Sequence, residues 1–286
     1  MKRSYTEMNR DESAHERVLA VVIPAYDEEG TIDTILARVD ALSCVREIIV
    51  VDDGSQDGTS RVVEAFDSSR VRLIRMDRNQ GKTAAVKRGV QEVSSPLTII
   101  QDADLEYDPR EIPFVIAPIL SGEADVVYGS RFIVRRAARV LYFYHYLANK
   151  GLTFLSNLLT NRNMTDIETC YKAFRTPVIQ RMPITSKGFG MEVEITAMVS
   201  KSNARTYEVP ISYYGRTYSE GKKIGVGDGF SALWYIFYYN LIAGWSNGRR
   251  AYIRSINEWL READAQVETH TSSPTTSQPD REMQEA

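Results

Sequence analysis

Cysteine and histidine are scarce in this chain of 286 residues, which holds two cysteines and three histidines. Cys44 and Cys170 lie far apart and form no Cys-x-x-Cys pair. A zinc site, which needs several sulfur or nitrogen ligands at close spacing, is therefore not expected. Both thiols are expected to be free, as is usual in a reducing compartment.

Long apolar runs are missing as well. No window reaches about 18 consecutive apolar residues, so no membrane-spanning helix is predicted. Residues 1–17 contain no apolar core of a signal peptide and are expected to form a flexible, polar lead-in. Residues 263–286 are rich in Ser, Thr, Pro and Gln and are predicted to be disordered. The expected location is the cytoplasm, with the inner face of the membrane as an alternative.

A large excess of positive charge is also absent. The formal net charge is −3, so no overall field favours nucleic acid, and nucleic acid is not expected as a partner. Any basic binding site must be local. The sequence does contain 43% hydrophobic and 26% charged residues, which is the composition of a globular protein with one main domain.

Apolar runs rich in β-branched residues alternate with helical patterns from residue 18 onward. We predict strands at 18–23, 47–51, 71–75, 97–101 and 126–129, with helices over 32–41, over 81–93 and after Pro109. Such alternation predicts an α/β fold in which helices cover both faces of a sheet. Ligands then gather at the carboxyl ends of the strands.

Carboxylates follow two of these predicted strands. Asp53 comes after the strand at 47–51, and Asp102, Asp104 and Glu106 come after the strand at 97–101. Carboxylates brought so close repel one another unless a hard cation neutralises them, and Mg²⁺ or Mn²⁺ completes its shell with phosphate oxygens. The simpler alternative is that Asp102 and Asp104 only cap the next helix. The upstream motifs favour a diphosphate site.

The sequence lacks two common types of glycine-rich, phosphate-binding loop. Residues 79–83, Asn-Gln-Gly-Lys-Thr, imitate the end of a P-loop, but Met76 stands where that motif needs glycine. After the first predicted strand, Pro-Ala-Tyr-Asp-Glu at 24–28 replaces the Gly-x-Gly-x-x-Gly turn of dinucleotide-binding proteins. A P-loop nucleotidase and a Rossmann dehydrogenase are therefore not expected.

Three ordered motifs carry a resemblance to a known family. Residues 22–29 (VIPAYDEE), 50–59 (VVDDGSQDGT) and 101–106 (QDADLE) resemble the nucleotide-binding half of family 2 glycosyltransferases with the GT-A fold. The subgroup is that of dolichyl-phosphate mannose synthase and the bacterial polyprenyl-phosphate glycosyltransferases. The resemblance implies a GT-A domain over 18–230, a Rossmann-like mixed sheet flanked by helices. Amphipathic or interfacial helices are expected to follow over 231–262.

The resemblance also implies a donor site. Asp53 would accept hydrogen bonds from the base, and Asp104 and Glu106 would hold Mn²⁺ or Mg²⁺ on the diphosphate. Many relatives carry glutamine in place of Glu106, a departure that bears on the metal preference. For Asp27 and Asp57 we favour helix capping. The nucleotide-binding set is Pro24, Ala25, Tyr26, Glu28, Asp53, Lys82, Asp102, Ala103 and Asp104, and the metal set is Asp102, Asp104 and Glu106.

The second half of the chain resembles the acceptor side of the family. Arg131 lies in a Gly-Ser-Arg-Phe strand end, and a planar guanidinium suits phosphate oxygens. Glu192 and Glu194 are two positions apart on a predicted helix, so only one of them can face the site. The catalytic candidates are Asp166, Glu168, Glu192 and Arg131. The candidates for binding the diphosphate or acceptor are Arg131, Arg175, Arg216, Lys222 and Lys223.

The reaction implied by the resemblance is a metal-dependent, inverting transfer of a sugar from a nucleotide diphosphate sugar. A UDP-sugar is preferred as donor and a GDP-sugar is the alternative. The expected acceptor is a polyprenyl phosphate, which needs no base because its oxygen is already ionised near neutral pH. A hydroxyl acceptor would instead require a carboxylate base, one of Asp166, Glu168, Glu192 and Glu194. A sugar nucleotidyltransferase and a non-catalytic nucleotide-binding protein are more remote alternatives.

An aromatic segment at 229–245 is followed by Arg249, Arg250 and Arg254. Aromatic side chains flanked by arginines are typical of a helix at a membrane surface. Peripheral membrane contact and burial in a homodimer are both compatible with this pattern, and the sequence does not choose between them.

Overall fold

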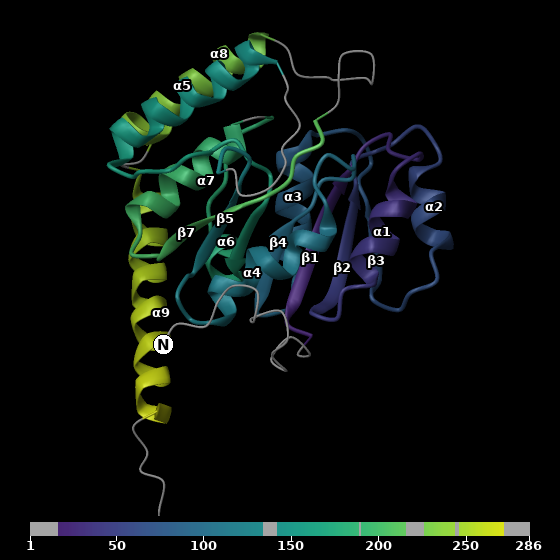
Figure 1. The fold of residues 1–286 in the computed structure, drawn as a ribbon, viewed down its shortest axis with the longest axis horizontal. Coiled ribbons are helices and arrows are strands. Elements are labelled where there is room, and N and C mark those ends of the chain that lie inside the picture. The colour runs from purple at the N-terminus through teal and green to yellow at the C-terminus, as the bar shows by residue number, and fades with distance from the viewer. Residues whose placement is uncertain (1–16, 134–141, 189, 216–225, 244–245, 272–286) are drawn as a thin grey trace, which may run out of the picture.

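The protein is described by a computed structural model over residues 17–133, 142–188, 190–215, 226–243 and 246–271. Its centre is a seven-stranded sheet with the strand order β3-β2-β1-β4-β6-β5-β7, and helices cover both faces (Figure 1). The strands are β1 Leu19–Ala25, β2 Val45–Asp52, β3 Val71–Arg75, β4 Leu97–Ile100, β5 Val126–Ser130, β6 Lys172–Arg175 and β7 Thr206–Pro210. The predicted α/β class is confirmed.

The first four strands form a parallel half. β1 pairs with both β2 and β4, and β2 pairs with β3. Every residue of β1 is buried, as expected for a continuous apolar strand covered on two faces. Helix α1 (Ile32–Asp40) buries Ile32, Ile35, Leu36 and Val39 at helical spacing. Helix α3 (Lys82–Gln91) packs against β1 and β2.

The second half is mixed. β6 runs antiparallel between β4 and β5, and β7 then pairs in parallel with β5. Helices α2 (Thr59–Ala65), α4 (Ile112–Leu120), α6 (Thr176–Gln180) and α7 (Gly190–Lys201) and the short helix η3 (Pro109–Glu111) complete the layers around the sheet. The helix expected after Pro109 is therefore confirmed.

Three longer helices lie outside these layers. α5 (Phe143–Thr160) and α8 (Val226–Phe237), which η5 (Tyr238–Ile242) extends, lie side by side beyond the edge of the sheet at which β1, β2 and β4 end (Figure 1). α9 (Asn247–Thr271) runs down one side of the molecule. Among the described residues, no helix is both long and apolar enough to cross a membrane.

Two predicted boundaries differ from the structure. The end of the GT-A domain expected at 230 falls inside α8, and α9 continues to Thr271, past the expected start of disorder at 263. The part of α9 before residue 263 is amphipathic, because Tyr252, Ile256 and Leu260 recur every four residues and are buried. The expectations for 1–16 and 272–286 lie outside the described residues.

Candidate functional site

The loop after β1 is joined to the loop after β2 by several hydrogen bonds. The Asp27 N–H donates to Ser55 Oγ (3.0 Å), and Asp27 Oδ1 accepts the Gln56 N–H (2.8 Å). Asp27 has a φ of 54°, a left-handed conformation that is uncommon for residues other than glycine. Asp27 therefore braces two loops and does not cap a helix. Asp57, by contrast, accepts the Thr59 N–H at the start of α2, which agrees with the capping role.

Asp53 lies at the carboxyl end of β2 and is 3% exposed. Its two carboxylate oxygens accept the N–H groups of Gln80 (2.8 Å) and Gly81 (2.7 Å). These bonds fix the turn that precedes α3 and so place Lys82 at the edge of the sheet. Binding of a base by Asp53 stays a prediction, as do the nucleotide contacts of the neighbouring loop at 24–28.

The loop after β4 carries the predicted metal ligands. Leu105 has a φ of 62°, which costs a non-glycine residue about 1 kcal/mol and is typical of functional loops. The bend lets Asp104 Oδ1 accept the Glu106 N–H (3.1 Å), and Tyr213 O–H donates to Glu106 Oε2 (2.8 Å). Asp102 and Asp104 are both half-buried at the mouth of this loop.

The carboxylate chemistry of this loop fits a hard cation. Asp102 and Asp104 offer the oxygen donors that Mg²⁺ and Mn²⁺ prefer. Among the described residues, no group of three or more His, Cys, Asp or Glu side chains forms a ready-made metal cage. The predicted metal set of Asp102, Asp104 and Glu106 is thus not gathered into a three-carboxylate cage in the described part of the chain.

Lys82 connects this loop to the second half of the chain. Its Nζ lies 2.6 Å from Asp102 Oδ1 and 3.9 Å from Glu192 Oε1, and it donates to Cys170 Sγ (2.8 Å). Burial alone would lower the pKa of Lys82, but the attraction of Asp102, Cys170 and Glu192 is larger and raises it well above its ordinary value. Lys82 is therefore a fixed positive charge beside the predicted donor site.

Arg131 and Asp166 form a buried ion pair. Arg131 Nε donates to Asp166 Oδ2 (2.7 Å) and Arg131 Nη2 donates to Asp166 Oδ1 (2.8 Å), while the guanidinium lies over the Tyr213 ring at 5.2 Å. The Asp166 side chain is fully buried. Burial acts to raise its pKa, but Arg131 outweighs this and lowers it. The prediction of Asp166 as a catalytic base is corrected, because a tightly paired carboxylate with a lowered pKa is a poor base. Asp166 instead positions Arg131.

Glu168 and Glu192 behave differently. Within the described part of the chain, Glu168 Oε1 and Glu192 Oε2 are buried and have no hydrogen-bond partner. Burial, and then repulsion from Glu192, raises the pKa of Glu168 to about 8. The neighbouring Lys172 is itself buried, and burial lowers its pKa. A pKa of about 8 suits proton transfer near neutral pH, so Glu168 remains a candidate base.

Glu168 gives the fold a measurable pH dependence. Its pKa rises from 4.5 to about 8 on folding, so between these values the folded state binds more protons than the unfolded state. The stabilising contribution of the Glu168 carboxyl is complete below its pKa in the unfolded state. It is lost as the pH rises through its pKa in the folded state. In Glu168→Gln, the loss of unfolding free energy between about pH 5 and about pH 8 should be smaller than in the unchanged protein. Denaturant titrations at both pH values measure this, and equal losses would contradict it.

Glu192 and Glu194 point in opposite directions from α7, as their spacing predicts. Glu194 is fully buried, forms an ion pair with Arg249 of α9, and accepts the N–H groups of Thr185 (2.9 Å) and Ser186 (2.8 Å). Glu192 faces Lys82. Glu194 therefore holds α7 and α9 together and is not available as a base.

Arg175 is a correction to the predicted phosphate-binding set. Because β6 is antiparallel to β4, its last residue lies opposite Leu97, at the start of β4 and at the far edge of the sheet from Asp102. Arg175 Nη1 pairs there with Asp125 Oδ1 (3.1 Å), and its guanidinium lies 4.5 Å from the Trp259 ring centre. The other predicted phosphate-binding residues of the late loop, Arg216, Lys222 and Lys223, lie outside the described residues.

Three tyrosines, Tyr107, Tyr171 and Tyr213, were missed by the sequence-based prediction. The Tyr107 ring stacks on Tyr171 (4.9 Å between ring centres) and lies 5.4 Å from Tyr213, and Tyr107 O–H accepts the Cys170 N–H (3.2 Å). Tyr107 follows the acidic motif directly, so its place in that loop is the signal that could have identified it. These rings join the loop after β4 to the Arg131 ion pair.

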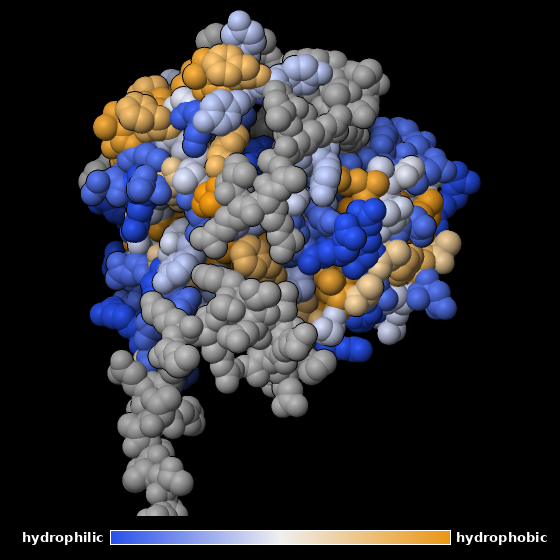
Figure 2. All heavy atoms as spheres, in the orientation of Figure 1, coloured by the Kyte–Doolittle hydropathy of each residue, from blue (hydrophilic) through white to orange (hydrophobic). Residues whose placement is uncertain are grey.

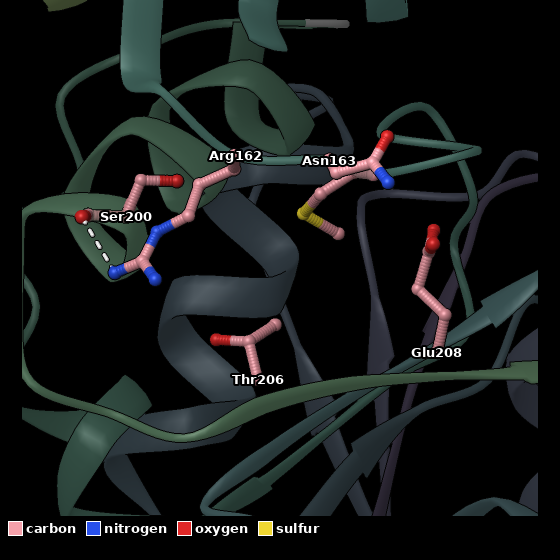
Figure 3. Close-up of a pocket in the computed structure, with 6 residues that line it drawn as sticks. Arg162, Asn163, Ser200, Thr206 and Glu208 are labelled. Carbon is pink, nitrogen blue, oxygen red and sulfur yellow. Dashed lines mark hydrogen bonds between the residues drawn. The ribbon is translucent and has the colours of Figure 1, made fainter.

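A cavity of about 270 Å³ lies elsewhere, beside β7 (Figure 3). Arg162 crosses one end of it and donates to the Ser200 carbonyl (2.9 Å), and Glu208 stands at the other end. No predicted site residue lines this cavity. The Glu208 carboxylate accepts the Thr165 N–H (2.9 Å) and the Asp166 N–H (3.2 Å), so it supports the backbone behind the Arg131 ion pair. The cavity is lined by Arg162, Asn163, Met164, Ser200, Thr206 and Glu208.

Comparison with known proteins agrees with this arrangement. Residues 20–182, more than half of the chain, match the model of Glycosyl transferase family 2. The chain is 30% identical to a dolichol-phosphate mannosyltransferase of Pyrococcus furiosus, over 72% of this chain and 59% of that protein. It is 29% identical to an undecaprenyl-phosphate 4-deoxy-4-formamido-L-arabinose transferase of Aeromonas hydrophila, over 72% of this chain and 63% of that protein. The chain thus spans less than two thirds of these relatives.

Solved structures show the same fold. A glucosyl-3-phosphoglycerate synthase from Mycobacterium tuberculosis with Mn²⁺, UDP and phosphoglyceric acid superposes with a TM-score of 0.65 at 19% identity, over 85% of each chain. The same enzyme with Mg²⁺ and UDP gives a TM-score of 0.64 at 19% identity, over 84% of this chain and 85% of that one. The fold is GT-A, and the chain belongs to glycosyltransferase family 2.

Proposed function

We propose that this protein transfers a sugar from a nucleotide diphosphate sugar to a polyprenyl phosphate with inversion at the anomeric carbon. The observation that carries the proposal is the loop after β4, where Asp102 pairs with Lys82 and Tyr107 contacts the Tyr213 ring over which Arg131 lies. The names of the two relatives, which specify dolichol phosphate and undecaprenyl phosphate, support this class of acceptor.

The donor side is assigned to the loops after β1, β2 and β4. A divalent cation held by Asp102 and Asp104 would neutralise charge on the departing diphosphate. Lys82 would neutralise the charge of the Asp102 carboxylate and hold the loop after β4 in place while one donor molecule is replaced by the next. We prefer a UDP-sugar as the donor, because the structures with the same fold contain UDP.

The acceptor side is assigned to Arg131. Two of its nitrogens are engaged by Asp166, which orients the guanidinium plane, and Asn149 of α5 accepts a further bond from Nη2 (3.3 Å). An arginine held in this way can meet a phosphate without losing side-chain freedom on binding. The ionised phosphate oxygen would attack the anomeric carbon as the bond to the nucleotide diphosphate breaks, so no protein base is required.

An assay of product release tests the proposal. Purified protein is incubated with UDP- and GDP-sugars and Mn²⁺ or Mg²⁺, with and without polyprenyl phosphate in detergent. Release of free nucleotide diphosphate that depends on the acceptor is expected, and a chelator should abolish it. Release of pyrophosphate would indicate a nucleotidyltransferase and would overturn the proposal.

Transfer to a hydroxyl group is the second candidate, because Glu168 combines a raised pKa with a buried oxygen that lacks a partner among the described residues. Glu168→Gln separates the two candidates. A base is obligatory for a hydroxyl acceptor, so this variant should lose about 100-fold or more in turnover if the acceptor is a hydroxyl. With a phosphate acceptor the loss should be much smaller.

A further inference from the structure

The turn that carries Asp166 is held by side chains of other elements. Residues 161–171 join α5 to β6, and within them the backbone N–H groups of residues 164–167 all donate to side-chain oxygens. We call residues 164–167 the Asp166 turn. Because a backbone N–H that is shielded from water needs a partner, the side chains that accept these four groups fix the place of the turn.

Helix α5 supplies the support on one side of the Asp166 turn. Asn157 Oδ1 accepts the Met164 N–H (3.1 Å), and Asn157 Nδ2 donates to the Met164 carbonyl (2.7 Å). Thr153 Oγ1 accepts the Ile167 N–H (3.4 Å). The first and the last N–H group of the turn are therefore both held from α5.

The polarity of α5 agrees with this role, because the helix turns polar side chains inward and apolar ones outward. Thr153 is 3% exposed and Asn157 is half-buried, whereas Phe154 and Leu158 are 70% and 68% exposed. Exposed apolar side chains of α5 and α8 form the orange area at the top of the molecule (Figure 2). A helix at a protein surface normally buries its apolar face. The inward polar side chains of α5 are explained by the Asp166 turn, which needs them as hydrogen-bond partners.

Strand β7 supplies the support on the other side. Both oxygens of Glu208 lie 2.9 Å from the Thr165 nitrogen, and Glu208 Oε1 also accepts the Asp166 N–H (3.2 Å) and the Thr165 O–H (3.1 Å). Met164 and Glu208 line the cavity beside β7 (Figure 3), so close packing does not hold the turn from that side. The Glu208 carboxylate holds it there by hydrogen bonds.

The Asp166 turn fixes Arg131. The Asp166 carboxylate accepts two bonds from the Arg131 guanidinium and a third from the Arg131 backbone N–H (3.1 Å). Ser130 Oγ lies 2.6 Å from Thr165 Oγ1, which adds a second link between the turn and the end of β5. A displacement of the turn would therefore move the guanidinium that is assigned to the acceptor phosphate.

We propose that Glu208 and Asn157 are positioning residues that set the place of the Arg131 guanidinium through the Asp166 turn. They act through Asp166 rather than on a substrate. The inference rests on the proposed function, in which Arg131 meets the acceptor phosphate. Misplacing such a group by about 1 Å can cost about 100-fold in rate although the group itself is unchanged.

Steady-state kinetics with polyprenyl phosphate test the proposal. Glu208→Ala should lower kcat/KM for this acceptor about tenfold or more, while the calorimetric affinity for a UDP-sugar with Mn²⁺ stays within about threefold of the unchanged protein. Glu208→Gln keeps an oxygen in the place of Oε1, which accepts three of the four bonds, so its kcat/KM should stay within about threefold. Asn157→Ala should act in the same direction as Glu208→Ala.

A double-mutant cycle shows whether Glu208 acts through the ion pair. In a background of Arg131→Met with Asp166→Asn the pair is absent, so adding Glu208→Ala should change the residual turnover less than about twofold. The full loss in this background would overturn the proposal. An unchanged kcat/KM in both Glu208→Ala and Asn157→Ala would overturn it as well.

Hydrogen exchange gives a readout that does not depend on turnover. The Arg131 N–H donates to Asp166, so peptides containing Arg131 should exchange faster in Glu208→Ala and at the unchanged rate in Glu208→Gln. The matched control is Asp125→Ala, which removes a buried carboxylate that accepts the Arg205 N–H (2.8 Å) at the opposite end of the β5–β7 pair and should leave exchange at Arg131 unaltered. Unaltered exchange in Glu208→Ala would contradict the positioning role. A lack of acceptor-dependent release of nucleotide diphosphate by the unchanged protein would instead count against the proposed function.

Discussion

Asp104→Ala is expected to abolish metal-dependent binding of the nucleotide sugar. Asp104 lies on the bent loop after β4, and its loss would leave Asp102, which already pairs with Lys82, as the remaining carboxylate of the Asp-x-Asp motif. A cation on a diphosphate would then lose one of its three predicted protein ligands. We expect turnover to fall about 100-fold or more, as for other losses of charge stabilisation at a leaving group.

Calorimetry with a UDP-sugar, in the presence of Mn²⁺ or of a chelator, measures this effect. The matched control is Asp33→Ala, which removes an exposed carboxylate from α1 and should leave donor binding unchanged. Equal donor affinity in Asp104→Ala and the unchanged protein would show that the loop does not hold the cation.

Arg131→Ala is expected to lower the free energy of unfolding by about 3–5 kcal/mol as well as to reduce turnover. The substitution leaves the fully buried Asp166 carboxylate without its bidentate partner, and an uncompensated buried charge is costly. The effect on turnover follows from the proposed contact of Arg131 with the acceptor phosphate. The buried ion pair adds the effect on stability.

Denaturant unfolding and steady-state kinetics separate the two contributions. Arg131→Met combined with Asp166→Asn removes both charges, so part of the lost stability should return while turnover stays low. If Arg131→Ala unfolds at the same denaturant concentration as the unchanged protein, the ion pair does not stabilise the fold in solution.

The parallel half of the sheet could be predicted from sequence because its strands are continuous runs of apolar residues. β1 and β2 are almost wholly buried, so nearly every position must be apolar. β6 and β7 were not predicted. They are four and five residues long, and their ends carry Lys172, Arg175 and Pro210, which give no strand pattern. The antiparallel direction of β6 depends on contacts with β4 and β5 that no local pattern encodes.

The same limit explains the errors in the candidate site. Asp102 and Lys82 of the predicted nucleotide-binding set lie beside Glu192 of the predicted catalytic set, although the three residues are far apart in the chain. The motifs did not reveal which charged groups neutralise one another. Asp166 pairs with Arg131, 35 positions away, and Glu194 pairs with Arg249, 55 positions away. An acid that the sequence offers as a base can therefore form a structural ion pair in the fold.

The ion pair between Glu194 and Arg249 sets a limit on how far the protein can be shortened. A fragment ending at residue 230 would keep every motif of the donor half, yet it would cut α8 and leave Glu194 buried without its partner Arg249. The same helix, α7, carries Glu192 into the site. Helix α9 therefore supports the family 2 domain itself, and trimming it should disturb the proposed turnover before it disturbs solubility.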